Sequence, residues 1–212
     1  MKILLSICLL WAFFSSVASL KCASCQTLSG RCDNIIPQEC QASEDACLSY
    51  HMASPMFGGI RLHFKSCVPS KACLPGNYTV TTTLSTHILL VFNCCSTDLC
   101  NSAALSVQQN TNSIPNGFEC PVCYSLGQNE CQKEGTVNCI GEETQCFSGA
   151  GSYSLNTSPV PGQQNFAFRG CTTKNTCALP TQTVGLSNGG IIVNITKLEC
   201  SNATSTPTTL TK

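Results

Sequence analysis

Pairs of cysteines are the first residues whose spacing points to chemistry. One C-x-x-C motif spans Cys22 and Cys25, and a second spans Cys120 and Cys123. Two thiolates at this spacing are typical of a structural zinc site or of a redox-active dithiol. Both functions need reduced cysteines, so the compartment of the protein decides between them and disulfide bonds.

The N-terminus indicates an oxidising compartment. Residues 1–19 contain Lys2, an apolar run over Ile3–Phe14 and then small residues, which is the layout of a secretory signal peptide. The apolar run is shorter than the roughly 20 residues that span a bilayer, which disfavours a retained anchor. Cleavage after Ser19 removes Cys8 from the 19 cysteines and leaves 18, an even number that can all pair. We therefore expect a secreted, extracellular protein with disulfides and no metal site.

The remaining polar residues form no recognisable catalytic motif. His51, His63 and His87 share no metal-ligand spacing, and neither H-E-x-x-H nor G-x-S-x-G occurs. Glu142 and Glu143 are adjacent in a predicted loop, where a solvated pair is expected rather than an acid/base couple. We expect no enzyme and no cofactor. The 11 basic and 11 acidic residues balance, which indicates no nucleic-acid partner.

The cysteines recur in two groups with nearly the same rhythm. The first group is Cys22, Cys25, Cys32, Cys40, Cys47, Cys67, Cys73, Cys94, Cys95 and Cys100, and the second is Cys120, Cys123, Cys131, Cys139, Cys146, Cys171, Cys177 and Cys200. Such repetition predicts two homologous domains, too small to hold a large apolar core without disulfides. We place the domains at residues 20–101 and 117–201, an uncharged linker at 102–116 and a Thr-rich tail at 202–212.

Strand patterns occupy the segments between the cysteines. Ile60–Lys65 alternates strictly, which places Arg61, His63 and Lys65 on a predicted solvent-exposed face. The other predicted strands are Leu48–Met52, Tyr78–Leu84, His87–Asn93, Phe147–Leu155, Phe166–Arg169 and Ile191–Leu198. Helical periodicity is absent after the signal peptide, so the predicted fold class is all-β, small and disulfide-rich.

The end of the first domain carries a family resemblance. Residues 94–101 read C-C-S-T-D-L-C-N, and with the opening C-x-x-C they resemble the Ly-6/urokinase-receptor, or three-finger, domain. The resemblance implies two tandem three-finger domains with the disulfides Cys22–Cys47, Cys25–Cys32, Cys40–Cys67, Cys73–Cys94, Cys95–Cys100, Cys120–Cys146, Cys123–Cys131, Cys139–Cys171 and Cys177–Cys200. In the second domain Ser201 stands where a cysteine belongs, so the closing bridge is missing, and we do not expect Asn202 to replace the family's asparagine.

Two such domains, the joining stretch P-N-G-F-E-C-P-x-x-C and an eight-cysteine second domain resemble the gamma-type phospholipase A2 inhibitors. The resemblance implies a secreted glycoprotein that binds secreted phospholipase A2 and that forms homo- or hetero-oligomers. One alternative is a secreted ligand or modulator of a cell-surface receptor or channel. Another is a secretory protein whose partner is a further copy of its family. The Thr-rich C-terminus lacks the hydrophobic tail of a glycolipid-anchor signal, so we expect no membrane anchor.

Contact residues and glycosylation sites are suggested by local sequence. Met56 and Phe57 lie at the predicted tip of the second finger, where an apolar pair can anchor a protein contact or fold back on its own finger. N-glycosylation sequons begin at Asn77, Asn156, Asn194 and Asn202, and Pro159 makes Asn156 the least convincing acceptor.

Overall fold

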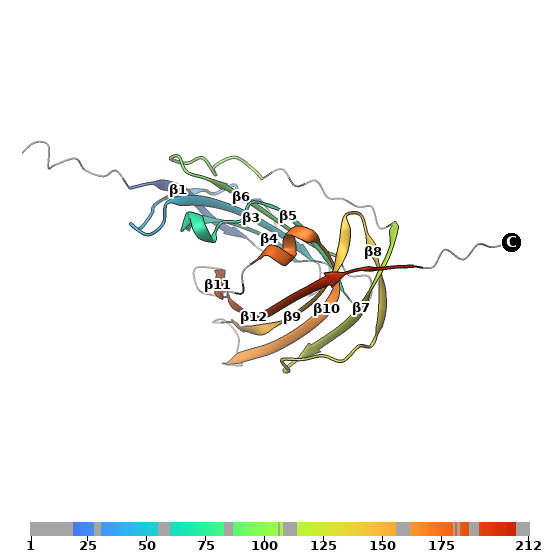
Figure 1. Ribbon diagram of the computed structural model, residues 1–212. Helices are drawn as coiled ribbons and strands as arrows, with labels where there is room; N and C mark the ends of the chain where they lie inside the picture. Colours follow the sequence, from blue (N-terminus) through green and yellow to red (C-terminus); the bar gives the residue numbers. More distant parts are fainter. Residues whose placement is uncertain are drawn as a thin grey trace, which may run out of the picture.

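The chain folds almost entirely as antiparallel β-strands (Figure 1). The computed structural model describes residues 19–27, 31–54, 60–82, 87–105, 107, 114–155, 162–179, 181, 183–186 and 191–206. Within these residues the helical elements are two short 3₁₀ turns, η1 (Ser70–Ala72) and η3 (Lys174–Ala178). The described part of the chain contains no helix long and apolar enough to cross a membrane.

The strands fall into two modules. The first module consists of β1 (Lys21–Thr27), β2 (Ile36–Glu39), β3 (Ala46–Ser54), β4 (Ile60–Val68), β5 (Gly76–Thr81) and β6 (His87–Cys95). The second module consists of β7 (Pro115–Leu126), β8 (Gly135–Ile140), β9 (Glu143–Leu155), β10 (Gln163–Thr173), β11 (Thr183–Leu186), β12 (Ile191–Asn202) and β13 (Thr204–Ser205). The all-β, disulfide-rich class predicted from the sequence is confirmed.

The long strands form a three-stranded unit in each module. In the first, β3 pairs with β4 on one side and with β6 on the other, so Tyr50 lies opposite both Phe64 and Phe92. In the second, β9 pairs with β10 and β12 in the same arrangement. The two strands predicted for the second finger, Leu48–Met52 and Ile60–Lys65, are confirmed as a paired hairpin, and its predicted tip at Met56 and Phe57 lies outside the described residues.

Within the described part of the chain, a single strand pairing joins the two modules into one sheet. Cys171 and Thr172 of β10 lie opposite Thr81 and Val80 of β5. The resulting strand order is β11-β12-β9-β10-β5-β6-β3-β4-β1-β2, with β7, β8 and β13 attached beside β10. We call the β5–β10 contact the module joint; Figure 1 shows β5 and β10 where the two groups of strands meet.

The buried interior is small and rich in cystine. One cluster is built around Cys22, Cys40, Cys47 and Cys67, and its counterpart in the second module adds Val122 and Val137 to Cys120, Cys139, Cys146 and Cys171. Because these clusters contain few aliphatic side chains, disulfides at roughly 2–4 kcal/mol each supply much of the stability.

The predicted solvent-exposed face of β4 is wrong for two of its three residues. Arg61 is exposed, but His63 is half-buried and Lys65 is only 5% exposed. The Lys65 Nζ donates to the carbonyl oxygens of Asn101, Ser102 and Ala103 at 2.7, 2.8 and 2.7 Å. Residues 101–103 therefore cover this part of the sheet, because their carbonyls solvate the ammonium group in place of water.

Candidate binding surface

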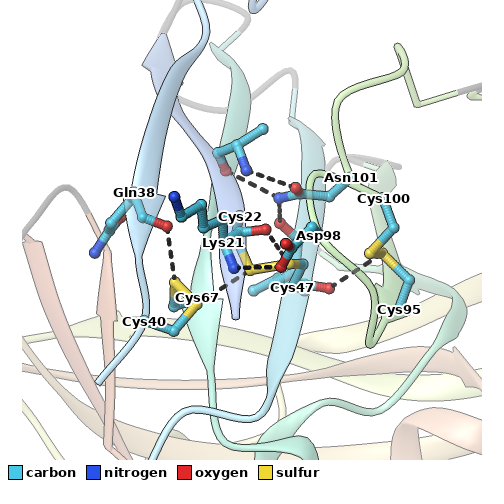
Figure 2. The surroundings of a disulfide bond; sticks show 12 residues. Lys21, Cys22, Gln38, Cys40, Cys47, Cys67, Cys95, Asp98, Cys100 and Asn101 are labelled. Carbon is cyan, nitrogen blue, oxygen red and sulfur yellow. Dashed lines mark hydrogen bonds between the residues drawn. A yellow bond between two sulfur atoms is a disulfide. The ribbon is translucent and has the colours of Figure 1, made fainter. Parts of the chain in front are cut away.

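The scaffold of each module is a cluster of disulfides at the base of its strands, which we call the knot of that module. All nine disulfides of the structure join the same cysteines as the resemblance implied. Figure 2 shows the first knot, where Cys22–Cys47 lies beside Cys40 and Cys67 and close to the Cys95–Cys100 loop. These bonds hold the strand bases together, so the strand faces are presented as a pre-ordered surface.

Asn101 closes the first knot (Figure 2). Its Oδ1 accepts a hydrogen bond from the Ala23 amide at 2.8 Å, and its Nδ2 donates to the carbonyls of Ala23 and Leu48 at 2.9 and 3.0 Å. The side chain thus bridges two strand segments while being only 4% exposed. A buried amide with its donors and acceptor engaged is a structural element rather than a binding group.

The second module closes differently. Asn202 is exposed, and its Oδ1 accepts a hydrogen bond from the half-buried Gln145, so it does not take the role of Asn101. Instead the chain continues as β13, in which Thr204 pairs with Glu119, and the Thr206 amide donates to the Gly117 carbonyl at 2.9 Å. Backbone pairing of residues 204–206 with β7 therefore ties down the end of the described chain where the missing disulfide would have done so.

The cysteine clusters offer no metal chemistry. Two groups of sulfurs, Cys22 with Cys40 and Cys67, and Cys120 with Cys139 and Cys171, each lie within 4.8 Å of one another. Each of these sulfurs is part of a disulfide, and metal binding requires a thiolate.

One cluster resembles a catalytic triad but has the wrong order. Thr81 Oγ1 lies 2.7 Å from His87 Nδ1 and 2.9 and 2.7 Å from the two carboxylate oxygens of Glu143. A nucleophilic triad places histidine between hydroxyl and carboxylate, whereas here the hydroxyl is in the middle and Thr81 is 0% exposed. The expected solvated pair of glutamates is thus wrong for Glu143, which begins β9 and is 0% exposed, while Glu142 is exposed.

His51 and His63 are brought together by strand register. They lie opposite each other on β3 and β4, with ring centroids 4.3 Å apart. His51 is 3% exposed and neither ring nitrogen has a hydrogen-bond partner. Burial first, then the positive charges of His63 and Arg61, lower the pKa of His51 from 6.5 to about 4. A neutral, enclosed imidazole of this kind is not positioned to act on a substrate.

A half-exposed aromatic face on the second module is the surface best suited to contact another protein. It consists of Tyr124 and Leu126 on β7, Tyr153 on β9, and Phe166 and Phe168 on β10. Phe166 lies opposite Leu126 and Phe168 opposite Tyr124, so these side chains share one side of the sheet. The four rings are half-buried and Leu126 is 52% exposed. We call these five residues the aromatic face.

Glycines in β9 create the space for this face. Phe166 lies opposite Gly151 and Phe168 opposite Gly149, with ring atoms 3.0 and 3.6 Å from the positions that a Cβ would occupy. The rings of Phe166 and Phe168 are 5.5 Å apart, and Phe168 also meets Phe147 edge-on at 5.1 Å. The equivalent face of the first module is closed, because Tyr50, Leu62 and Phe64 are 6%, 1% and 8% exposed.

The sequence-based candidates do not coincide with the aromatic face. Met56, Phe57 and Asn156 lie outside the described residues. Asn77 and Asn202 are exposed, and Asn194 is half-buried on β12. The aromatic face itself could have been suspected from the alternation of Phe166 and Phe168, but sequence alone does not show that the facing strand carries glycines there.

Several known proteins are similar in sequence to most of this chain. The chain is 31% identical to Phospholipase A2 inhibitor NAI of Notechis ater, over 84% of this chain and 86% of that protein. It is 28% identical to Phospholipase A2 inhibitor CNF of Crotalus durissus terrificus, over 96% and 97% of the two chains. It is 29% identical to the Urokinase plasminogen activator surface receptor of Bos taurus, over 74% of this chain and 46% of the receptor.

The repeat seen in the cysteines is also found by comparison with protein families. The model of the u-PAR/Ly-6 domain matches twice, at residues 18–103 and 116–208. These two matches contain the two sets of strands that the structure forms. The chain belongs to the u-PAR/Ly-6 domain family and carries two copies of its domain.

Proposed function

We propose that this chain is a non-enzymatic extracellular protein that captures a secreted phospholipase A2 and blocks it sterically. The observation that carries the proposal is likeness along nearly the whole chain to proteins named phospholipase A2 inhibitors, at 28–31% identity. A pre-ordered apolar surface without a catalytic arrangement among the described residues is consistent with inhibition by coverage of the target.

The aromatic face is the proposed contact surface. Aromatic side chains dominate the energetics of protein interfaces, and these are held on strands rather than on loops. Because the disulfides and the sheet order the face before binding, little conformational entropy is lost on contact. The face would cover the apolar mouth through which a lipase takes up its substrate.

Two further features of the chain belong to this proposal. Met56 and Phe57 are proposed as a second contact, and their replacement by serine should weaken binding without unfolding the protein. We also propose cleavage after Ser19 and N-glycans at Asn77, Asn194 and Asn202, with Asn156 as the weakest acceptor. N-terminal sequencing and glycopeptide mass spectrometry test these assignments. Light scattering tests whether the purified chain forms a homo-oligomer, as the family resemblance implies.

The decisive experiment is a titration of the purified, oxidised protein into a panel of secreted phospholipase A2 enzymes. Hydrolysis of micellar substrate is followed at several substrate loads. We expect inhibition that saturates at a fixed stoichiometry and persists in excess substrate, because the inhibitor binds the enzyme and not the micelle. Absence of inhibition across the panel, with intact disulfides, refutes the proposal.

A pair of matched variants locates the contact. Leu126→Asp places a charge in the aromatic face, and Ile36→Asp places one on β2, the terminal strand of the first module, where Ile36 is 70% exposed. We expect at least a tenfold loss of affinity for the first and none for the second, since a buried unpaired charge is costly. Equal effects of the two variants on affinity would exclude the aromatic face as the contact surface.

A receptor-directed role is the second candidate. It is supported by the similarity to the bovine protein named Urokinase plasminogen activator surface receptor, at 29% identity over 74% of this chain. Saturable binding of the protein to receptor-bearing cells, without any effect on phospholipase A2, would favour this ligand or modulator function.

A further inference from the structure

The module joint brings two backbones into direct contact. A Cβ on Gly170 would lie 2.0 Å from the Thr81 carbonyl oxygen, so only glycine permits the observed approach. Side chains extend the contact: Thr172 Oγ1 donates to the Thr79 carbonyl at 2.8 Å, and Asn175 Nδ2 donates to the Asn77 carbonyl at 2.6 Å. The modules are thus held in one orientation by short, directional bonds.

A fully buried carboxyl group lies in this joint. Glu143 of the second module reaches Thr81 of the first with both oxygens, and one of them also accepts from the Ile140 amide at 3.2 Å. A hydroxyl group has one proton to donate, yet Thr81 also lies 2.7 Å from His87 Nδ1. The Thr81 hydroxyl can therefore donate to either Glu143 or His87, but not to both. For both contacts to be hydrogen bonds, the other group must carry a proton and donate it to the Thr81 oxygen.

Among the described residues, no cationic side chain forms an ion pair with Glu143. The two ion pairs within the described residues, Lys21–Glu39 and Lys197–Glu199, are elsewhere. Around the carboxyl group, β5 contributes Thr79 and Thr81 and β8 contributes the Ile140 amide. His87 on β6 contacts the same Thr81 hydroxyl and is, among the described residues, the one other titratable side chain in this hydrogen-bond network. Ionised Glu143 would thus be a buried charge stabilised by hydrogen bonds alone, which is costly.

We propose that Glu143 is a proton-dependent lock of the module joint, which is tight when its carboxyl group is protonated and loosens when that group ionises in place. The regulated property is the mutual orientation of the two modules, and this proposal is independent of the identity of the binding partner.

The pH dependence has a definite sign. Burial raises the pKa of Glu143 above 4.5, against smaller opposing effects of the bonds from Thr81 and Ile140. The stabilisation of the joint is then fully present below pH 4.5 and is lost as pH rises through the raised pKa. Burial lowers the pKa of His87 below 6.5, so its contribution has the opposite sign and is lost as pH falls through the lowered pKa. The effect of Glu143 must therefore be isolated by substitution.

Hydrogen exchange of the β5 amides at Thr79–Thr81 measures opening of the joint. Protection factors, corrected for intrinsic exchange, are recorded between pH 4 and 9 for the full disulfide-bonded wild-type chain, Glu143→Gln and Glu142→Gln. Glutamine keeps the shape of the protonated side chain, and Glu142 is the exposed neighbour with the same charge. We expect the ratio of protection, Glu143→Gln over wild type, to rise about tenfold per pH unit from pH 4.5 to the raised pKa and then to level off.

Two results overturn the proposal. One is a ratio that does not change with pH, and the other is an equal change in Glu142→Gln. A second measurement uses the unmodified chain: the side-chain carboxyl carbon of Glu143 is titrated by NMR. A midpoint above 4.5 supports the lock, and a midpoint at or below 4.5 refutes it even if the variant fails to fold.

Discussion

Lys65 holds the segment that follows the first knot: its Nζ lies 2.7 Å from the carbonyl oxygen of Asn101, in a site where the lysine is 5% exposed. Two further carbonyls, of Ser102 and Ala103, complete the coordination. Burial lowers the pKa of this lysine, but three acceptors keep the ammonium group satisfied. These three contacts thereby fix residues 101–103 against β4.

Lys65→Met should remove this attachment while keeping the length of the side chain. Three carbonyls then lose their donor, and we expect a loss of about 1–3 kcal/mol in the free energy of unfolding measured with urea. Lys71→Met, at an exposed lysine in η1, serves as the control and should change stability by less than about 0.5 kcal/mol. Equal effects would mean that the carbonyl contacts of Lys65 are energetically unimportant.

Asn101→Asp tests the closing contact of the first knot. The substitution replaces the Nδ2 donor by an acceptor, so the carbonyls of Ala23 and Leu48 lose their partner. We expect a cost of about 1–3 kcal/mol for each acceptor left unpaired. Asn138→Asp, on the exposed side of β8, introduces the same change without these bonds. The free energy of unfolding in urea is measured for both variants. An Asn101→Asp protein as stable as Asn138→Asp would contradict the bridging role of Asn101.

His51 should make the protein sensitive to acid. Its folded-state pKa of about 4 lies below the ordinary 6.5, so its stabilisation is complete above pH 6.5 and is lost as pH falls toward 4. His51→Phe keeps a ring beside His63 and removes the two unpaired nitrogens. Thermal melting between pH 7 and 4 should therefore show a smaller decrease for the variant than for wild type. An unchanged pH dependence would assign acid sensitivity to other groups.

Gly151 and Gly149 provide a matched pair on β9. A Cβ on Gly151 would lie 2.1 Å from the Asn194 carbonyl oxygen, whereas a Cβ on Gly149 would meet the Phe168 ring at an ordinary 3.6 Å. Gly151→Ala must push β12 away, and we expect a loss of about 1–3 kcal/mol in unfolding free energy. Gly149→Ala should remain within about 1 kcal/mol of wild type. A larger loss of stability for Gly149→Ala than for Gly151→Ala would mean that the close approach of β9 and β12 does not require glycine at position 151.

Much of the fold was accessible from local sequence. Strict alternation at Ile60–Lys65 identified a strand, and the recurring cysteines identified two copies of one domain. Both signals are short-range: side-chain alternation follows from strand geometry, and the repeat is visible without any three-dimensional information. The disulfide pairs followed from family resemblance, since spacing alone permits many connectivities.

Local sequence therefore specifies the framework of strands, cystines and two modules. The environment of individual polar and aromatic residues within this framework depends on how the strands and segments pack in three dimensions. The sequence predicted that Lys65 is solvent-exposed, but residues 101–103 cover it in the structure. The sequence likewise predicted a solvated Glu143, but this residue contacts Thr81 of the other module. The aromatic face likewise depends on glycines in the neighbouring strand. Burial is set by segments distant in sequence, and neither strand periodicity nor cysteine spacing carries information about which segments those are.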